Sequence, residues 1–451
     1  MSKPKILVNG LIVSNGFRFI GSIVVNKGLI SALDVGITDI ATINPDEYDI
    51  YDCRGKFVLP GVIDEHVHFR DPGMTEKGDI STESRAAVAG GVTSFFDMPN
   101  TIPTTTSIEA WEKKMARAAE ASECNYAFFL GATADNMREI LNADYTRIPG
   151  VKFFLGSSTG GMLMGDEKSV RRLFEQFPGV IACHAESEQI IAENRRIYAE
   201  KYPEGIPLKY HSEIRSRKAC LEATRRAVEL ARETGARLHV MHVSTADELQ
   251  FFTPGSVDGE RITAETCPHY LLLNEDSVER TGGLTKCNPA LKTEQDRRAL
   301  LRALADGRIN TIGSDHAPHQ LSLKRRGDAI TAPSGMPSVQ FVLPLMMQLA
   351  MKGHFSLETV VDRMCAAPAR LYNISRRGFI RQNFMADIVV VNPDDEYEIT
   401  RDMVLSRCGW SPYEGMKVKF RVEQTWVNGQ LAYDHGRFTG EQKALAVRFN
   451  V

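Results

Sequence analysis

Two histidines stand two residues apart in the segment GVIDEHVHFRDPG, residues 61–73, which follows an apolar run. Residues two apart in an extended strand point to the same face, so His66 and His68 would face together, with Arg70 next in line. Imidazole nitrogens are ligands for zinc and similar divalent metals. A guanidinium is suited to holding a carboxylate through two parallel hydrogen bonds. The segment therefore suggests metal chemistry beside an anion-binding group, although a single H-x-H pattern is a weak signal.

Further polar side chains stand where other apolar runs end. They are Asp97, Asn100, Lys152, His184, His242, Asn288, Asp315 and His319. Strand periodicity leaves two choices open. His239 and His242 are three apart and are not both expected to face the interior of a barrel, and the neighbours Asp315 and His316 pose the same choice.

Each of these residues also has a purely structural explanation. A single buried histidine is more often hydrogen-bonded than bound to a metal, Lys152 could extend its ammonium out of a strand end, and Asp315 could cap a turn. We favour a metal site because many such residues coincide at strand ends of one predicted barrel. The set is His66, His68, Lys152, His184, His242 and Asp315.

Apolar strands alternate with helical segments over residues 56–375. The eight strand segments are GVIDEHVHFR, GVTSFFDMPN, NYAFFLGA, GVKFFLGSS, GVIACHAES, RLHVMHVST, ITAETCPHY and INTIGSDHAP. Repeated strand–helix units predict a parallel sheet, and eight of them favour a closed α/β barrel of the (β/α)8, TIM type. Function in such a barrel lies at the carboxyl ends of the strands, where the polar residues above fall.

Short β-branched runs separated by turn residues fill both ends of the chain. Residues 1–55 and 376–451 share this style, with Asn-Gly and Lys-Gly pairs punctuating the runs. Such pairs are typical of hairpin turns. We expect both ends to combine into one small β-sandwich-like domain, because two separate pieces would each have a thin core.

Composition excludes several classes of protein. Of the 451 residues 43% are hydrophobic and the net charge is only −3, which favours neither disorder nor a nucleic-acid-binding surface. The eight cysteines are scattered without C-x-x-C spacing, as in reduced proteins. We find no signal-peptide pattern and no apolar stretch long enough to cross a bilayer. The expectation is a cytoplasmic protein with no membrane or nucleic-acid partner.

A resemblance to a known family rests on a series of motifs spread along almost the whole chain. They are GVIDEHVHFRDPGMTEKGDISTESRAAVAGGVTSFFDMPNTIPTT, VKFFLGSSTG, HAES, HVST, TCPHYL, CNPALK, SDHAPH, SGMPSVQ and SPYEGMKVKFRVEQTWVNG. In this order they resemble the dihydroorotases of the cyclic-amidohydrolase superfamily. The resemblance implies a barrel with two metal ions and a small β-domain made from both termini.

The same resemblance implies a ligand set. His66, His68 and Asp315 would hold one divalent metal ion, His184 and His242 would hold a second, and zinc is the expected metal. Lys152 matches a lysine that many relatives carry as an N-carboxylate bridging the two ions; some bacterial dihydroorotases have an aspartate there instead. Three more acids or bases near strand ends are interpreted as supporting residues: Asp79, Glu186 and His269.

The substrate is inferred from the residues beyond the ligands. Arg70, Asn100 and His319 suit the ring carboxylate of dihydroorotate, which hydantoin and allantoin lack, and Asn288 would contact the ring or order its loop. Two metals would supply hydroxide, and Asp315 would carry its proton to the departing ring nitrogen. The expected reaction is the reversible hydrolysis of (S)-dihydroorotate to N-carbamoyl-L-aspartate, the third step of pyrimidine synthesis.

Other readings remain open. The TCPHYL and KCNPALK motifs resemble hydantoinases, dihydropyrimidinases and allantoinases as much as dihydroorotases. A non-catalytic relative that supports aspartate carbamoyltransferase is a more distant alternative, since such relatives have usually lost metal ligands. We expect a homo-oligomer, a dimer or tetramer, with aspartate carbamoyltransferase as a potential partner. The polar segment after His319, up to Gly335, is either a lid or a surface loop.

Overall fold

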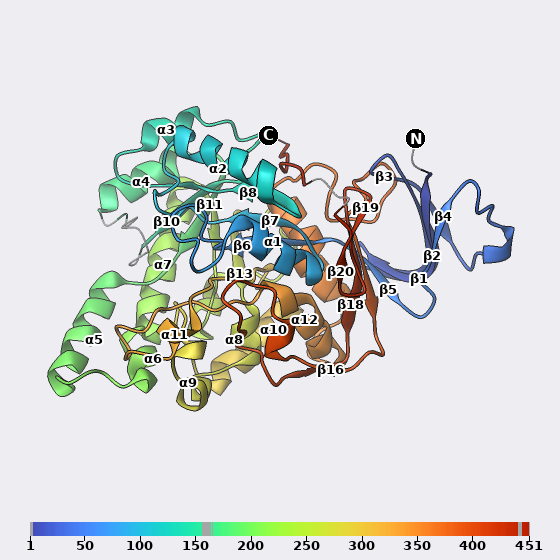
Figure 1. Cartoon of the computed structure of the whole chain (residues 1–451). Coiled ribbons are helices and arrows are strands. Elements are labelled where there is room, and N and C mark those ends of the chain that lie inside the picture. Colours follow the sequence, from blue (N-terminus) through green and yellow to red (C-terminus); the bar gives the residue numbers. More distant parts are fainter. Residues whose placement is uncertain (1–2, 156–163, 165, 441–443, 451) are drawn as a thin grey trace.

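The structure is a computed structural model that describes residues 3–155, 164, 166–440 and 444–450. Its centre is a ring of parallel strands wrapped by helices (Figure 1). Eight strand positions follow the chain: β6 (Val62–Val67), β7 (Val92–Asp97), β8 (Asn125–Phe128) with its continuation β9 (Leu130–Gly131), β10 (Val151–Phe154), β11 (Val180–His184), β12 (Arg237–Val240), β13 (Ile262–Thr266) and β14 (Thr311–Ile312). The predicted (β/α)8 barrel is confirmed.

Backbone pairing closes this ring. Neighbouring strands pair in parallel through the series β6–β7–β8 and β9 to β14, and a parallel bridge between Val67 and His316 joins the last strand to the first. The strand residues are almost all buried, which explains why their sequences are continuous apolar runs without strict alternation. The last residues of the predicted fourth strand, from 156 onward, lie outside the described residues.

Helices cover the outside of the ring. The main ones are α1 (Ile80–Ala89), α2 (Ile108–Ala121), α4 (Glu167–Gln176), α5 (Glu188–Lys201), α7 (Arg217–Thr234), α10 (Glu294–Asp306) and α12 (Val342–Met351). In α7 the buried residues Ala223, Ala227 and Leu230 recur at helical spacing and turn one face to the barrel. Side-chain caps begin several of these helices. Asp79 caps α1 by accepting from the backbone N–H of Thr82, which confirms its interpretation as a supporting residue.

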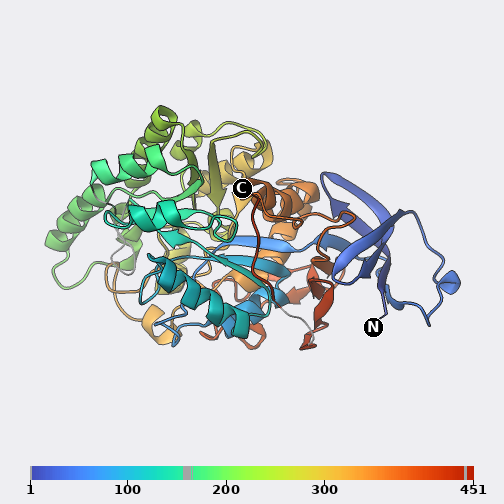
Figure 2. The ribbon, with the colours of Figure 1, turned by 90° about the horizontal axis from the view of Figure 1, so that it is seen from above.

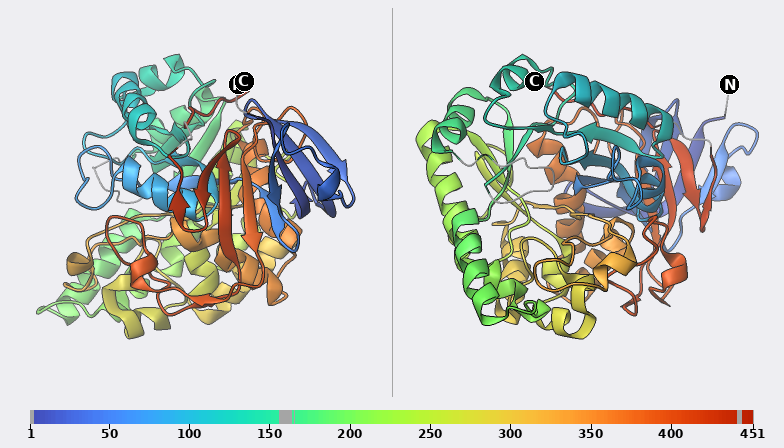
Figure 3. Two further views of the ribbon diagram at one scale, coloured as in Figure 1. Left: turned by 45° about the vertical axis from the view of Figure 1, so that its right-hand side comes forward. Right: turned by 60° about the vertical axis from the view of Figure 1, so that its left-hand side comes forward.

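The two chain ends form one hydrogen-bonded sheet, as expected (Figure 3). Its strands run in the order β20 (Arg437–Phe438), β19 (Gln430–Asp434), β18 (Arg421–Val427), β15 (Ile388–Asn392), β5 (Phe57–Pro60), β1 (Lys5–Ser14), β2 (Phe17–Asn26) and β3 (Leu29–Val35), while β4 (Asp49–Asp52) pairs with β1. One apolar cluster joins strands from both ends, including Ile12, Val58, Ile388 and Trp426. Figure 2 shows the N-terminal strands projecting away from the barrel.

The segments differ from the expected division at three places. β5 lies inside residues 56–375 but pairs with β1 and β15, so the terminal sheet extends to Pro60. Residues 401–416 lie at the barrel, where the indole N–H of Trp410 donates to the carbonyl of His319 at 2.8 Å. Residues 446–449 also return to the barrel, since Ala446 bridges to Tyr126. The last two segments, residues 401–416 and 446–449, lack the long apolar runs that mark barrel strands, so composition alone assigned them to the β-domain.

The chain has three Asn-Gly pairs, and the two that follow a valine behave differently. Asn428 and Gly429, with φ of 51° and 75°, form the hairpin turn between β18 and β19, as predicted. Asn9 and Gly10 instead lie inside β1, at a shift in its pairing with β2. The Asn9 side chain accepts from the backbone N–H of Thr38 at 2.7 Å, and a Cβ on Gly10 would come 2.3 Å from Val58. This pair is therefore a β-bulge.

Candidate active site at the barrel mouth

A cavity of about 80 Å³ lies at the carboxyl ends of the barrel strands. Nine of the ten site residues predicted from the sequence line it: His66, His68, Arg70, Asn100, Lys152, His184, His242, Asn288 and Asp315. The tenth, His319, stands behind Arg70, with its Nε2 3.3 Å from Nη2 of the guanidinium. Four lining residues were not predicted, namely Phe154, Ala317, Ser334 and Gly335. The strand ends thus bring together residues that are up to 249 positions apart in the chain.

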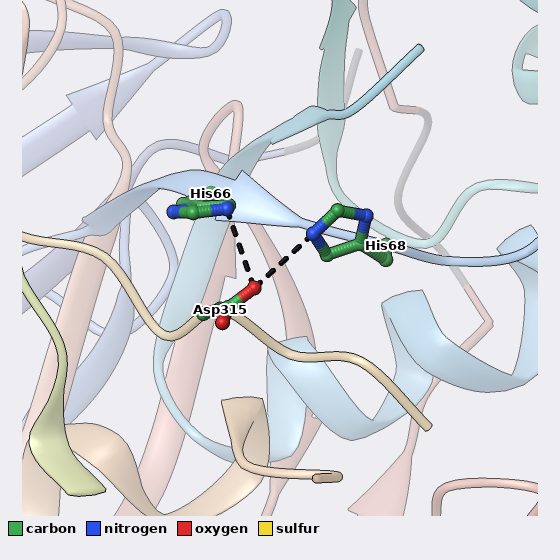
Figure 4. Close-up of side chains that lie close together, drawn as sticks. All are labelled: His66, His68 and Asp315. Atoms are coloured by element: carbon green, nitrogen blue, oxygen red, sulfur yellow. Dashed lines mark ion pairs between the residues drawn. The ribbon is translucent and has the colours of Figure 1, made fainter. Parts of the chain in front are cut away.

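Two histidines and an aspartate converge on one point of this cavity (Figure 4). Oδ1 of Asp315 lies 3.3 Å from Nε2 of His66 and 3.1 Å from Nε2 of His68. Ligand atoms around a tetrahedral zinc, each about 2.1 Å from the ion, are about 3.4 Å apart. The observed spacing therefore fits a single divalent ion held by these three side chains.

A second group faces the first across the cavity. Nδ1 of His184 lies 2.8 Å from Nε2 of His242, and the ring of His242 is 5.4 Å from that of His66, centre to centre. Lys152 is buried and points its ammonium into the same cavity, 2.8 Å from Sδ of Met241. Two imidazoles at hydrogen-bonding distance need to separate by only about 0.5 Å to share an ion. The donor set thus fits two neighbouring divalent ions.

The structure excludes the alternative explanations of Lys152. Its side chain neither leaves the strand end toward solvent nor pairs with Asp166, since Asp166 caps α4 by accepting from the backbone N–H of Ser169 at 2.8 Å. Within the described part of the chain, no carboxylate lies within ion-pairing distance of Lys152. Burial, the largest effect, lowers the pKa of Lys152 to about 8.

Both choices left open by strand periodicity are resolved. His242 reaches the cavity, whereas Nε2 of His239 lies 3.3 Å from Glu65 across the interior of the barrel. The expectation that only one of the two histidines faces inward is wrong, because β12 ends at Val240 and the backbone turns at His242 with φ of 41°. Asp315 faces the cavity.

His316 turns away from the cavity and has a structural role. Its Nε2 lies 2.8 Å from Oε2 of Glu83, and its Nδ1 accepts from the backbone N–H of Ser338 at 3.0 Å. Both ring nitrogens are therefore occupied.

Three of the site residues adopt left-handed backbone conformations. Arg70, His242 and Asp315 have φ of 67°, 41° and 45°. Such angles are uncommon for residues other than glycine and cluster at functional sites, where the surrounding structure holds them. They place the three side chains in directions that a regular strand would not give.

A second layer of polar groups orients the candidate ligands. Oε1 of Glu265 lies 2.8 Å from Nδ1 of His66 and accepts from the backbone N–H of His242 at 3.0 Å. Oδ1 of Asn100 lies 2.8 Å from Nδ1 of His68, so this residue also orients a ligand. Such contacts fix the tautomer and leave Nε2 free to bind a metal.

Glu186 supports the second group of ligands, and Glu265 was missed by the sequence analysis. Oε2 of Glu186 lies 3.0 Å from Nε2 of His184 and pairs with Arg215, which confirms the supporting role expected for Glu186. The signal for Glu265 was present as an acid inside an otherwise apolar strand, ITAET. A charge at such a position is costly unless it has a partner.

Burial sets the protonation of the ligand side chains. Desolvation lowers the pKa of both His66 and His68 to about 4, so both imidazoles are neutral near pH 7 and can bind metal. Although burial alone would raise the pKa of Asp315, the neighbouring His66 and His68 hold it below its usual range. The carboxylate is therefore ionised and can act as a ligand or proton acceptor.

The arginine in the cavity wall has no acidic partner among the described residues. Arg70 is 3% exposed, and its Nε donates to the carbonyl of Pro318 at 3.3 Å. Among the described residues, no carboxylate lies within ion-pairing distance of its guanidinium. Burial lowers the pKa of Arg70 to about 10, which still leaves it charged. A buried cation of this kind favours an anionic ligand.

The segment after His319 forms part of the cavity wall. It contains the short helix α11 (Leu321–Lys324), and the buried ammonium of Lys324 donates to the carbonyls of Lys286, Pro333 and Gly335 at 2.8, 2.9 and 2.8 Å. Ser334 and Gly335, which follow, line the cavity. The segment is therefore tied to the barrel and is not a plain surface loop, and its function as a lid stays a prediction.

His269 lies close to the first ligand group. One of its ring nitrogens is within 4.8 Å of a carboxylate oxygen of Asp315, and burial lowers its pKa to about 4. Its side chain is absent from the cavity lining and neither ring nitrogen has a hydrogen-bond partner in the described structure, so the supporting role expected for it stays a prediction.

Comparison with known proteins identifies the family. Residues 57–432 match the model of the amidohydrolase family. The chain belongs to the amidohydrolase family. This amidohydrolase is 33% identical to an allantoinase of Bacillus velezensis over 92% of the chain and 93% of that protein. It is 35% identical to a dihydroorotase of Halobacterium salinarum over 84% of the chain and 86% of that protein.

A solved structure agrees with these relatives. The L-hydantoinase (dihydropyrimidinase) from Arthrobacter aurescens superimposes with a TM-score of 0.92 and 28% identity, covering 99% of this chain and all of the other. The amidohydrolase described here is thus a cyclic amidohydrolase, and relatives named allantoinase, dihydroorotase and L-hydantoinase are similarly close. No helix among the described residues is long and apolar enough to cross a membrane.

Proposed function

We propose that this amidohydrolase is a dihydroorotase, which hydrolyses the cyclic amide of (S)-dihydroorotate reversibly to N-carbamoyl-L-aspartate. The observation that carries the proposal is Arg70, a buried guanidinium without an acidic partner among the described residues, in the wall of the cavity. A ring carboxylate would neutralise this charge through two hydrogen bonds. A neutral ring would leave the charge buried and unpaired.

Two neighbours of Arg70 support the same substrate. Asn100 directs its Oδ1 to His68, which leaves its amide N–H groups for an acceptor on the ligand. His319 touches the guanidinium and also lies 3.0 Å from the carbonyl of Ser334, so its imidazole is held beside the proposed carboxylate site. Asn288 lines the cavity, and its Oδ1 has no hydrogen-bond partner in the described structure, which suits a ring N–H.

The metal ligands in this proposal are the six predicted residues. His66, His68 and Asp315 would hold one ion; His184 and His242 would hold the other; and Lys152, as an N-carboxylate, would bridge them. Zinc is the proposed metal because imidazole and carboxylate are its usual ligands at such distances. Carboxylation would convert a buried cation without an acidic partner into an anion between two cations. When bound, the ions would polarise the ring carbonyl and acidify a water molecule.

The side chains of the cavity would orient the substrate, transfer the proton and hold the metal ligands in place. Arg70 and Asn100 would hold the ring carboxylate and so orient the scissile amide toward Asp315. The carboxylate of Asp315, ionised near neutral pH, would accept the proton of the attacking water and deliver it to the departing ring nitrogen. The His66–Glu265 and His68–Asn100 contacts would keep the ligands in place throughout.

A hydantoinase or dihydropyrimidinase is the second candidate. The structural overlap with the Arthrobacter aurescens L-hydantoinase favours it, because that agreement covers the whole chain. An allantoinase is supported by sequence identity in the same way. A non-catalytic role is less well supported, since every predicted ligand is present and all of them line one cavity.

Substitution of Arg70 separates these candidates. If the substrate carries a carboxylate, Arg70→Met should lower kcat/KM for dihydroorotate by a factor on the order of 100 or more while both metals stay bound. Arg70→Lys should recover part of this loss, because it keeps the charge without the planar fork. Near-normal turnover by Arg70→Met, with normal metal content, would remove the basis of the substrate assignment.

Assembly remains a prediction. We propose a homo-oligomer, and apolar side chains exposed near one edge of the terminal sheet support it: Phe17 is 69% exposed and Val35 77%. Light scattering at micromolar concentration tests this, and a monomer would contradict it. Association with aspartate carbamoyltransferase is testable by mixing the two purified proteins and looking for a joint peak in size-exclusion chromatography.

A further inference from the structure

A second cavity, of about 300 Å³, adjoins the catalytic one. Asn288 and Ser334 line both cavities, so the two share part of one wall, whereas His319, which stands behind Arg70, lines only the second cavity. The opposite wall comes from α5 and from α6 (His211–Ile214), which lie next to α11 in Figure 1. We call this space the basic antechamber and define it by its titratable lining residues Glu188, Arg195, His211, Arg215 and Lys286.

Cations outnumber acids in the basic antechamber. Three of its side chains are cationic, whereas Glu188 is its one carboxylate among the described lining residues. Arg215 pairs with Glu186, but the buried ammonium of Lys286 donates to the carbonyl of Ala332, which brings no negative charge. Burial lowers the pKa of Lys286 to about 8. This excess of positive charge favours an anion inside the cavity.

His211 indicates that the ligand must also donate a hydrogen bond. Its Nε2 donates to the carbonyl of Cys287 at 2.9 Å, since a carbonyl oxygen only accepts. Burial lowers the pKa of the imidazole to about 3, so Nδ1 carries a lone pair and acts as an acceptor. The residue is 4% exposed, and Nδ1 has no partner in the part of the chain that the structure describes. A buried acceptor of this kind calls for a ligand that donates a hydrogen bond.

We propose that the basic antechamber binds a small carboxylate that also carries N–H donors, which is the chemistry of an open-chain ureido acid. Such acids are the ring-opened forms of cyclic ureides, so the identity of the ligand rests on the proposed function. Hydrolysis of a ring amide creates one new carboxylate, and a ring that already carries one opens to a dianion. The antechamber offers Arg195 and Lys286 to the additional charge, whereas Arg70 is the one arginine among the described lining residues of the catalytic cavity.

Arg195 and Arg196 provide a matched pair of variants. Both are exposed on α5, but Arg195 lines the antechamber, whereas Arg196 points elsewhere and pairs with Glu193 and Glu200 at 2.8 and 2.5 Å. Arg195→Gln and Arg196→Gln therefore remove the same charge from neighbouring positions. Neither residue belongs to the catalytic cavity.

The test is calorimetric binding of two probes to the metal-loaded full-length protein at low ionic strength. N-carbamoyl-L-glutamate supplies two carboxylates and a ureido group, and glutarate supplies the carboxylates alone. Arg195→Gln should weaken binding of both probes about two- to fivefold, while Arg196→Gln leaves it unchanged. Lys286→Gln should weaken it on the order of tenfold, because this cation is buried.

Each outcome decides a part of the proposal. If Arg195→Gln and Arg196→Gln bind the two probes with equal affinity, the proposed anion site is wrong. This comparison remains valid even if the Lys286→Gln variant fails to fold. Equal affinity of glutarate and N-carbamoyl-L-glutamate for the unaltered protein overturns the need for an N–H donor. Binding requires no turnover, so an Arg195-dependent affinity in a protein inactive on dihydroorotate would refute the proposed function and retain the antechamber.

Discussion

His66, His68 and Asp315 illustrate how burial produces reactivity at single residues. Removal from water keeps the imidazoles neutral, and their proximity keeps the carboxylate ionised. Neutral imidazole and ionised carboxylate are the forms that bind divalent metals. The same arrangement therefore prepares metal binding and leaves an acceptor for a proton.

Asp315→Asn tests the proton acceptor. The substitution keeps the shape but removes the charge, so kcat should fall by a factor on the order of 1,000 even in protein that retains its metals. Metal analysis by mass spectrometry, run beside the dihydroorotate assay, gives the two quantities needed. Substantial turnover at normal metal content would assign the proton transfer to another group, with His269 the nearest candidate.

Lys152→Ala tests the bridging ligand. Without the bridge, the two ions would lose a shared anion, so bound metal and activity should fall together, with activity reduced at least about 100-fold. Short carboxylic acids such as formate or acetate should restore part of both by occupying the vacated space. Intact-protein mass spectrometry of native metal-loaded enzyme gives a direct reading. An unmodified lysine in fully active enzyme with two bound metals would contradict the carboxylate.

Sequence patterns could locate most of the residues of this site, but they could not show for every residue whether its side chain faces the cavity. His66 and His68 follow from period-two spacing, because β6 is extended up to Val67. His242 and Asp315 could not be chosen over their neighbours, because each sits at a positive φ outside a regular strand. Glu265 needed the fold, since its partner His66 lies 199 residues away.

At the scale of elements, a single ammonium ties together two segments of the cavity wall. Lys324 donates to the carbonyl of Lys286, two residues before Asn288, and to those of Pro333 and Gly335 around Ser334. Three donors thus meet three acceptors, which satisfies the buried group without an acidic partner. The ammonium fixes the position of residues that contact the proposed ligand.

Lys324→Gln should loosen this wall. We expect kcat/KM for dihydroorotate to fall on the order of tenfold while both metals stay bound. The reason is that displaced wall residues would no longer hold the substrate in the orientation that the reaction needs. Arg325→Gln is the matched control, since Arg325 is the exposed next residue and should leave activity unchanged. Equal activity in both variants would show that the segment keeps its position without Lys324.

The barrel strands could be predicted as elements because each is a buried apolar run that ends in polar residues. The terminal sheet could be predicted from its β-branched runs and hairpin turns. Residues 401–416 and 446–449 could not be assigned, because their contacts with the barrel, such as Trp410 with His319, involve single side chains and isolated bridges. Local patterns carry no information on such contacts.

At the scale of the whole molecule, buried imidazoles couple stability to pH. Burial lowers the pKa of His66, His68 and His269 to about 4 and that of His211 to about 3, whereas a histidine in the unfolded chain titrates near 6.5. The unfolded chain therefore binds more protons at these groups between pH 6.5 and 4. Their contribution is fully present above pH 6.5 and is lost as the pH falls, up to about 3 kcal/mol for each imidazole with a pKa near 4 and about 5 kcal/mol for His211.

Urea unfolding of metal-free protein measures this dependence. The free energy of unfolding should fall from pH 6.5 to pH 4.5 in the presence of a chelator. His211→Gln keeps a donor toward the carbonyl of Cys287 but cannot titrate, so it should reduce the slope by about one proton. An unchanged slope in this variant would mean that His211 is already protonated in the folded protein.

The central claim is that this amidohydrolase acts on a ring that carries a carboxylate, and one comparison of substrates tests it most directly. The metal-loaded protein is offered dihydroorotate, dihydrouracil, hydantoin and allantoin, and kcat/KM is measured for each. Arg70, buried without an acidic partner in the described structure, predicts that dihydroorotate is preferred over the three neutral rings by a factor on the order of 100 or more. An equal or higher kcat/KM for any of the neutral rings would contradict the assignment.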